Sequence, residues 1–320
     1  ERAEILDVIG ATVRLGDGDT LPEGADVLVV SPGLPPRSPV ILAAQDQGVP
    51  VWGELELAWR LRGPDAAPWL VVTGTNGKTT TTLMLASMLR AAGHRTAAVG
   101  NIGVSLVDAV MDPEGYDVLA VEVGAPQLPF LSTASPLASV CLNVAPDHID
   151  LFGSFEAYTA AKARIYTNTQ VAAVYDLAEP ETLRMVEEAD VVEGCRAIGI
   201  TRGIPSLSML GVVDDLLVDR AFVENRRESA QELASVHDVR PFAPHNITNA
   251  LAAAALARAF GVPASAVREG LRTFEPAGHR IAEVGEVDGV RYVDDSKATN
   301  CHAAETSLLA YGPVVWIAGG

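Results

Sequence analysis

The feature that most constrains the fold of this chain is a glycine-bearing loop between an apolar run and a helix-like segment. Residues 69–72 (WLVV) have the pattern of a buried strand, residues 73–80 read TGTNGKTT, and residues 81–92 have a helical pattern. A strand, a glycine-rich loop and a helix in this order form the setting in which such a loop binds phosphate. The loop amides and the positive end of the helix face the anion. The segment therefore predicts a nucleotide-binding core of the α/β class.

Two side chains of this loop have a predicted chemical role. Lys78 would contact the outer phosphates, and the Thr79 hydroxyl would hold a magnesium ion. The common phosphate-loop pattern places a glycine where this chain has Val72. The alternative is a glycine-rich turn that only caps a helix. The order Gly77, Lys78, Thr79 favours the phosphate loop over that alternative.

Composition excludes several classes of partner. The chain has 320 residues, of which 48% are hydrophobic, so it is long enough to bury one large core or two smaller ones. The formal net charge is −18, so the basic footprint of a nucleic-acid-binding protein is missing. No apolar run is long enough for a membrane helix. Cys141, Cys195 and Cys301 are widely spaced without a C-x-x-C pair, which is typical of reduced thiols in a cytoplasmic protein.

Strand and helix patterns alternate along the chain, which predicts an α/β fold with mainly parallel sheets. The predicted strands are residues 26–30, 49–52, 69–72, 96–99, 117–122, 138–143, 171–175, 290–293 and 314–318, with paired strands within 201–240. The predicted helices are residues 39–47, 54–61, 81–92, 154–165 and 246–260, with another near 302–309. Residues 62–68 (RGPDAAP) have the composition of a linker, and residues 274–278 (FEPAG) interrupt the pattern again.

Both ends of the chain look too small to fold alone. Residues 281–320 offer two or three strands and one helix, far short of a sheet with both faces covered. The first residue is not methionine, and Gly319-Gly320 directly follow a predicted strand. We therefore expect this sequence to be a piece of a longer protein.

Polar residues follow several of the predicted strands. Glu122 ends the run DVLAVE, and Asp147, His148 and Asp150 follow the strand at 138–143. Ligand-binding groups gather at the carboxyl ends of parallel strands, so Glu122 is a candidate magnesium ligand, with a solvated strand-end carboxylate as the alternative. A lone histidine is more often structural than a ligand, but the position of His148 after a strand that should also point at the nucleotide favours a functional role. Lys162, taken alone, has the pattern of a solvated helix lysine.

A further polar cluster lies beyond the FEPAG break. His279 and Arg280 follow it, and residues 294–297 (DDSK) end the next predicted strand. Arg280 and Lys297 would suit the charge that develops on a transferring phosphoryl group. An interdomain salt-bridge cluster is the alternative, and the spacing alone leaves both open.

Taken together, these motifs resemble the Mur ligase family, the ATP-dependent amino-acid ligases of peptidoglycan assembly. TGTNGKTT, the strand-end Glu122, DHID, AAKARIY, HNITNA, GHR and DDSKATN occur in the order and spacing of that family, over essentially the whole chain. SPG at residues 31–33 and above all DDSKATN are similar to the branch that joins D-glutamate to UDP-N-acetylmuramoyl-L-alanine.

The resemblance implies an α/β architecture of three domains, with a central phosphate-loop ATP-binding domain between two Rossmann-like domains that both look truncated here. Residues 1–64 would be the second half of the N-terminal domain, which binds the UDP substrate. Residues 65–276 would be the central domain. Residues 277–320 would begin the C-terminal domain, which binds the amino acid.

The resemblance also implies roles for individual residues. Lys78, Glu122, His148 and Lys162 would be catalytic; Thr79 and Glu122 would hold one Mg²⁺, and His148 and Lys162 a second, with Lys162 carrying a carbamate. The residues expected to bind ATP are Gly74, Thr75, Asn76, Gly77, Lys78, Thr79, Thr80, Asn249, Arg280, Asp295 and Lys297. The residues expected to bind the other substrates are Ser31, Pro32, Gly33, Asn101 and Thr299.

The activity implied is ligation of D-glutamate to UDP-N-acetylmuramoyl-L-alanine through an acyl phosphate, by a cytoplasmic monomer that uses ATP and two Mg²⁺ ions.

Two alternatives stay open: another ligase of the superfamily, similar to folylpolyglutamate synthase, and a nucleotide-binding module without ligase activity. The second draws on a departure from the family pattern. The family usually has S-S-F-Q-L after the glutamate, whereas residues 124–128 read GAPQL, without two hydroxyls and an aromatic ring. Cys301 also stands where proline is common.

Overall fold

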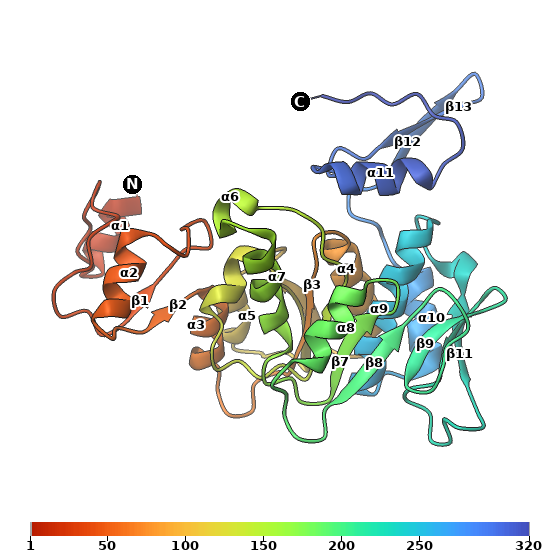
Figure 1. Ribbon diagram of the computed structural model, residues 1–320, viewed down its shortest axis with the longest axis horizontal. Coiled ribbons are helices and arrows are strands. Elements are labelled where there is room, and N and C mark those ends of the chain that lie inside the picture. The colour runs from red at the N-terminus through yellow and green to blue at the C-terminus, as the bar shows by residue number, and fades with distance from the viewer. Residues whose placement is uncertain (1, 320) are drawn as a thin grey trace.

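The computed structural model describes residues 2–319, and three parts follow one another along the chain (Figure 1). The N-terminal segment, on the left of the view, has a parallel strand pair, β1 (Leu28–Val29) and β2 (Val51–Trp52), with α1 (Arg2–Val8) and α2 (Pro39–Asp46). The strand, helix and strand predicted between residues 26 and 52 are therefore confirmed. Val30, Val40 and Ile41 form a small core that also takes in Phe130 of the central body.

The central body is built on one nine-stranded sheet in the order β11-β10-β9-β8-β7-β6-β3-β5-β4. The strands from β4 to β9 in this order pair in parallel, and β10 and β11 are antiparallel. The mainly parallel α/β fold predicted from the sequence is confirmed. The strands are β3 (Trp69–Thr73), β4 (Thr96–Gly100), β5 (Val118–Glu122), β6 (Ala138–Cys141), β7 (Ala172–Asp176), β8 (Arg196–Ile200), β9 (Met209–Val213), β10 (Leu216–Asp219) and β11 (Gln231–Ser235).

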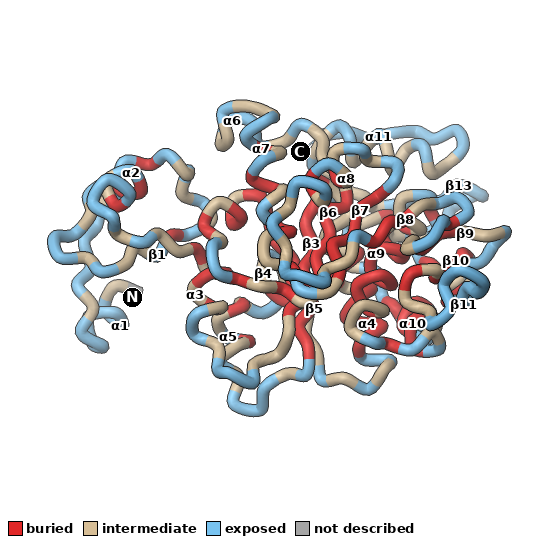
Figure 2. Tube along the Cα trace, turned by 60° about the horizontal axis from the view of Figure 1, so that its bottom comes forward, coloured by how far each residue is buried: buried red, intermediate tan, exposed pale blue. Residues whose placement is uncertain are grey.

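One face of this sheet is covered by three helices: α4 (Lys78–Ala91), α9 (Pro244–Phe260) and α10 (Ala264–Arg272). α9 contributes an alanine-rich buried surface, which lets the helix lie close to the strands. α4 and α10 approach so closely that a Cβ atom on Gly270 would lie 2.4 Å from the Cα of Met88. The Ser87 hydroxyl donates to the Gly270 carbonyl across the same contact, at 2.7 Å. The buried residues are concentrated in the central body (Figure 2).

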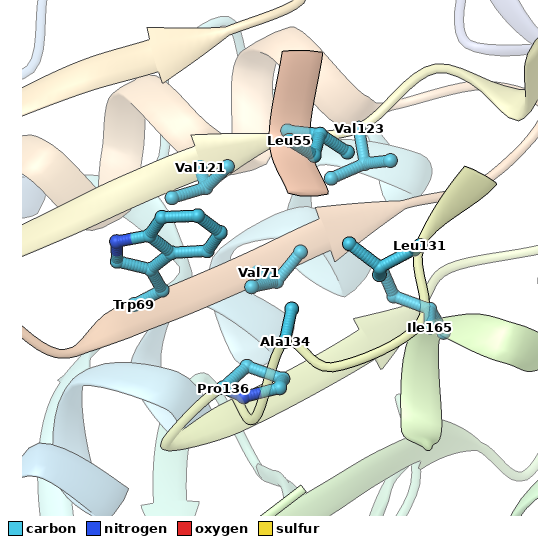
Figure 3. Close-up of a pocket in the computed structure, with 9 residues that line it drawn as sticks. All are labelled: Leu55, Trp69, Val71, Val121, Val123, Leu131, Ala134, Pro136 and Ile165. Atoms are coloured by element: carbon cyan, nitrogen blue, oxygen red, sulfur yellow. The ribbon is translucent and has the colours of Figure 1, made fainter. Parts of the chain in front are cut away.

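The other face carries shorter elements: α3 (Glu54–Leu61), α5 (Leu106–Val110), η1 (Ala125–Phe130), α6 (Ile149–Phe152), α7 (Phe155–Ala163), η2 (Arg164–Tyr166) and α8 (Pro180–Glu187). Leu55 and Ala58 place α3 in the same hydrophobic core as β3 and β5, although α3 precedes the domain boundary predicted at residue 64. A cavity of about 10 Å³ remains in this core (Figure 3). Its lining is entirely apolar, so it is a packing gap rather than a binding site.

The C-terminal segment is a hairpin, β12 (Ala282–Val287) and β13 (Val290–Asp294), followed by α11 (Cys301–Leu309). The helix predicted near residues 302–309 is confirmed. The strand predicted at 314–318 is wrong: these residues have no strand partner within the described chain, and Val315 and Ile317 are 94% and 90% exposed. An apolar run becomes a strand only when a neighbouring strand completes its backbone hydrogen bonds. Within residues 2–319, no helix is long and apolar enough to cross a membrane.

Candidate active site

The phosphate loop joins the end of β3 to the start of α4. α4 begins at Lys78, three residues before the predicted start, and Gly77 precedes it with a φ of +85°. Only glycine adopts this backbone conformation at low cost. A side chain is excluded for a second reason, since a Cβ atom at Gly77 would lie 2.5 Å from Oδ1 of Asn249. Asn249, which the sequence assigns to ATP, thus lies directly beneath the loop, on α9.

The end of β6 fixes the shape of the loop. The Thr75 amide donates to the Asn143 carbonyl at 3.0 Å. The Asn76 amide donates to Oδ1 of Asn143 at 2.9 Å, and Nδ2 of Asn143 donates back to the Asn76 carbonyl at 3.2 Å. This pairing makes Asn143 a structural part of the loop. The sequence reasoning missed Asn143, although its position just after a buried strand is a signal that could have found it.

Lys78 and Thr79 are the first two residues of α4, directly after the loop. The Lys78 ammonium donates to the carbonyls of Gly74 and Thr75, at 3.0 and 2.9 Å, so it curls over its own loop. Burial lowers the pKa of Lys78, and the nearby Glu122 carboxylate opposes that effect. The Thr79 hydroxyl accepts a hydrogen bond from Nη2 of Arg280 at 3.1 Å. A side chain of the C-terminal segment therefore reaches the loop.

Glu122 ends β5, the strand paired with β3, and it is 1% exposed. Its Oε1 accepts a hydrogen bond from Nδ2 of Asn101 at 2.8 Å, and the Asn101 amide donates to the Glu122 carbonyl. Oε2 is buried and has no partner among the described residues. A buried carboxylate oxygen without a donor is costly unless a cation or a donor from a ligand reaches it. This geometry does not match a solvated strand-end carboxylate.

Lys162 lies on α7 and is 1% exposed, unlike the solvated lysine that its helical pattern suggests. Burial lowers its pKa to about 7, and the positive charge of Lys78 acts in the same direction. Its ammonium lies 4.8 Å from the centre of the Tyr158 ring. The Lys162 ammonium makes no hydrogen bond or ion pair with another described residue. The helix period that suggested exposure fails here because elements distant along the chain, η1 among them, pack against α7.

The DHID segment begins α6, where His148 has a φ of +51°. The His148 side chain is 52% exposed and lies 3.8 Å from the carboxylate of Asp147. The negative charge of Asp147 acts to raise the pKa of both Lys78 and Lys162.

Tyr158 links the phosphate loop to Lys162 and was also missed from the sequence. It is 1% exposed, and its hydroxyl lies 2.9 Å from Oγ1 of Thr75. Burial raises its pKa far above the ordinary value, so the hydroxyl stays protonated. A signal was available, since Tyr158 precedes Lys162 by one helical turn and the two share a face of α7.

The C-terminal segment presents the GHR and DDSK motifs together. The Lys297 amide donates to the His279 carbonyl at 3.1 Å, and the Ile281 amide donates to Oδ1 of Asp295 at 3.1 Å. Nδ1 of His279 lies 2.5 Å from Oδ2 of Asp294. Within residues 2–319, Arg280 forms no ion pair and contacts the Thr79 hydroxyl instead, which disfavours the salt-bridge alternative for this arginine.

The residues expected to bind the muramoyl substrate and glutamate are spread over separate segments of the structure. Ser31, Pro32 and Gly33 form the turn after β1, and Thr299 lies between β13 and α11. A cleft of about 350 Å³ lies close to the first group, between the N-terminal segment and α7. Its lining includes Pro36, Arg37, Pro129, Phe152 and Arg164.

Comparison with known proteins decides the family. The Mur ligase middle domain matches residues 72–257, more than half of the chain and the whole of the loop, Glu122 and Lys162. The chain belongs to the Mur ligase family. It is 65% identical over 319 residues to UDP-N-acetylmuramoylalanine--D-glutamate ligase of Streptomyces avermitilis, covering 100% of this chain and 68% of that protein. The identity to the Thermobifida fusca ligase of the same name is 54%, covering 100% of this chain and 69% of the relative.

Solved structures share the fold of this Mur ligase at low sequence identity. A pseudomurein peptide ligase type C from Methanothermus fervidus has a TM-score of 0.58 at 18% identity, over 97% of this chain and 70% of that one. UDP-N-acetylmuramate-alanine ligase from Thermotoga maritima has a TM-score of 0.53 at 20% identity, over 97% and 69%. FolC of E. coli, in complex with DHPP and ADP, has a TM-score of 0.55 at 20% identity, over 79% and 67%.

The metal sites expected for a Mur ligase can be tested on these side chains. The free Oε2 atom of Glu122 is a hard oxygen donor of the kind that Mg²⁺ prefers. The ammonium of Lys162 is no ligand until it is converted into an oxygen donor. No group of three His, Cys, Asp or Glu side chains within residues 2–319 could hold a metal ion on its own.

The GAPQL departure has a structural counterpart in this Mur ligase. Residues 125–130 form the 3-10 helix η1, and Oε1 of Gln127 accepts a hydrogen bond from the Gly124 amide at 2.8 Å. A Cβ atom at Gly124 would lie 3.2 Å from Oδ1 of Asn101. Glycine here therefore leaves room for the Asn101 side chain that holds Glu122. The departure is compatible with the organisation of the site.

Proposed function

We propose that this chain carries out ATP-dependent ligation of D-glutamate to UDP-N-acetylmuramoyl-L-alanine, a step of peptidoglycan precursor synthesis in the cytoplasm. The observation that carries this proposal is the 65% identity, over the whole chain, to a curated ligase of that name. Similarity to folylpolyglutamate synthase rests on the fold alone, at 20% identity to FolC. The protein would act as a monomer.

The chemistry begins with the carboxylate of the muramoyl substrate, which attacks the γ-phosphorus of ATP and releases ADP. The amine of D-glutamate then attacks the resulting acyl phosphate, and inorganic phosphate leaves from the tetrahedral intermediate with the former carboxylate oxygen. Lys78 and the loop Gly74–Thr80 would bind the phosphates, with Asn249, Arg280, Asp295 and Lys297 as further ATP contacts. Both nucleophiles in this scheme belong to the substrates, so the reaction needs no covalent intermediate with the protein.

Two magnesium ions would be held by Thr79 and Glu122 and by His148 and Lys162. When bound, they would neutralise the charge that develops on the transferring phosphoryl group. Glu122 supports this assignment through its free buried oxygen. Thr79 would have to exchange its present hydrogen bond with Arg280 for the ion.

Carbamylation of Lys162 is supported by its surroundings. Burying an ammonium without an ion pair or a hydrogen bond costs far more free energy than burying a neutral amine. With a pKa of about 7, a large part of this amine is neutral at physiological pH and able to attack carbon dioxide. The product is an anionic carbamate, which would be stabilised by the nearby positive charge of Lys78.

The muramoyl substrate would enter through the cleft beside α7. The turn formed by Ser31, Pro32 and Gly33 is followed by Pro36 and Arg37, which line this cleft, and Ala161 in its wall directly precedes Lys162. Asn101 would lie along the path of the substrate, and Thr299 would approach glutamate from the other side.

The test is phosphate release by the full-length protein with UDP-N-acetylmuramoyl-L-alanine and a panel of amino acids. We expect release to depend on D-glutamate, with L-glutamate close to background. Release with a folate substrate and L-glutamate would favour the superfamily alternative. Background release with every acceptor, despite normal ATP binding, would favour a nucleotide-binding module without ligase activity.

A further inference from the structure

A chain of amide and imidazole groups connects the phosphate loop to α11. Nδ2 of Asn300 donates to Oδ1 of Asn76 at 3.2 Å. On its other side, Nδ2 of Asn76 lies 3.1 Å from Nδ1 of His302. The Asn76 side chain therefore contacts two residues at the start of α11. Its backbone is fixed in turn by Asn143, so the contact joins two well-defined elements.

The backbone amide of Ala303 determines which atom is the donor in each hydrogen bond of this series. The backbone amide of Ala303 can only donate, and it donates to Oδ1 of Asn300 at 2.8 Å. Nδ2 of Asn300 therefore faces Asn76 and requires an acceptor there, which is Oδ1. Nδ2 of Asn76 is then left as the donor to His302. Its partner, Nδ1 of His302, must carry a lone pair, and the imidazole proton sits on Nε2.

We propose that His302 is a positioning residue, which docks the C-terminal segment on the phosphate loop only while its Nδ1 is unprotonated. Protonation would place an N–H of His302 opposite the N–H of Asn76 and break the contact. The Asn76 amide has no free rotation to avoid this, because turning it would oppose two N–H groups at Asn300 instead. The contact is therefore specific for the neutral imidazole.

Docking matters because the same segment carries Arg280, Lys297 and Thr299. The inference rests on the proposed function, which assigns these residues to ATP and glutamate. The other contact between this segment and the loop runs from Arg280 to the Thr79 hydroxyl, which is also an expected metal ligand. Once Thr79 binds the ion, the contact of Asn76 with Asn300 and His302 still orients the segment.

Neighbouring charges act against docking at low pH. The carboxylate of Glu179, just before α8, interacts electrostatically with His302, and Glu305 lies one turn further along α11. The Glu179 carboxylate attracts a positively charged imidazolium, whereas the contact with the Asn76 amide requires a ring nitrogen without a proton. Docking should therefore be complete while Nδ1 of His302 carries no proton and should be lost once that nitrogen is protonated.

The test compares three variants of the full-length protein. His302→Ala removes the acceptor. His302→Asn replaces it with an amide oxygen that accepts a hydrogen bond at any pH. His237→Ala is the matched control, since His237 is another exposed histidine, which stacks on Phe242 instead of contacting the loop.

At about pH 8, His302→Ala should lower kcat/KM for D-glutamate by about two- to tenfold, the factor expected for one neutral hydrogen bond. The kcat/KM of His302→Asn should stay near the wild-type value. Between pH 8 and pH 6, kcat/KM of the wild type should decline, and the decline should be smaller in both variants. His237→Ala should follow the wild type throughout. If His302→Ala matches the wild type in rate and in pH profile, the proposal is overturned.

A second readout needs no ligation. The ¹⁵N resonances of the histidine side chains should show His302 at neutral pH with a bare Nδ1 and a protonated Nε2. A proton on Nδ1 at neutral pH would refute the proposed docking. If the wild type fails to use D-glutamate but shows the expected tautomer, the proposed function fails and the docking contact stands.

Discussion

Replacing the buried carboxylate of Glu56 by an amide should make stability less dependent on acid. Glu56 lies on α3 and is completely buried. Its Oε2 accepts hydrogen bonds from the amides of Ser132 and Thr133, both at 2.9 Å. Its Oε1 accepts from the Thr133 hydroxyl at 2.6 Å and from Nε of Arg60 at 2.7 Å. The carboxylate thus ties α3 to the residues that follow η1.

The magnitude follows from the pKa of this group. Burial alone would raise it, but the hydrogen bonds from Thr133 and Ser132 outweigh burial and lower the pKa from 4.5 to about 2. At about 1.4 kcal/mol per pKa unit, the difference corresponds to about 3 kcal/mol. Because the pKa of the folded state is depressed, this stabilisation is fully present above about pH 4.5. It is lost progressively as pH falls toward about 2.

The assay is urea unfolding of the wild type and Glu56→Gln, followed by tryptophan fluorescence. Trp59 and Trp69 report on this core, since their rings pack edge to face with ring centroids 4.9 Å apart. The wild type should be more stable than the variant by about 3 kcal/mol at pH 7, and this difference should shrink to about half near pH 3. Glu275→Gln, at an exposed site, should change little at either pH. A difference that is equal at both pH values, or below about 0.5 kcal/mol at pH 7, would refute this reasoning.

Three other predictions concern the site and its support. Lys78→Ala should weaken ATP binding by about 1.5–3 kcal/mol, because it removes a charge-assisted phosphate contact. Unchanged ATP affinity in calorimetry would show that Lys78 does not bind the phosphates. Lys162→Ala should be inactive and regain part of its activity with short carboxylates such as formate; full activity without rescue would exclude a role for the carbamate. Tyr166→Phe should lower the free energy of unfolding in urea by about 1–3 kcal/mol, because the buried hydroxyl accepts a hydrogen bond from the Cys141 amide and donates one to the Val174 carbonyl. A variant as stable as the wild type would contradict this prediction.

Local pattern was sufficient to predict the elements on which the site is built. The run at residues 69–72 and the glycines after it predict β3 and its loop, and the helix at residues 54–61 has the same bounds in the structure. Parallel strands end at one edge of the sheet, so the proximity of Glu122 to the loop also followed from the sequence. These features depend on neighbours along the chain or on a general property of parallel sheets.

Features that depend on distant segments were not predictable in the same way. Lys162 was expected at a solvated helix face, and it is buried because elements distant along the chain, such as η1, pack against α7. Residues 314–318 are as apolar as a strand, but no described strand pairs with them. The contact of Asn76 with α11 joins residues more than two hundred positions apart, so no local spacing indicates it.

The central claim is that ATP activates the carboxylate of the muramoyl substrate as an acyl phosphate. The most direct measurement uses UDP-N-acetylmuramoyl-L-alanine labelled with ¹⁸O in that carboxylate, incubated with the full-length protein, ATP and D-glutamate. The inorganic phosphate is then analysed by mass spectrometry. The account predicts one ¹⁸O atom in the phosphate for each amide bond formed. Amide formation with unlabelled phosphate would contradict it.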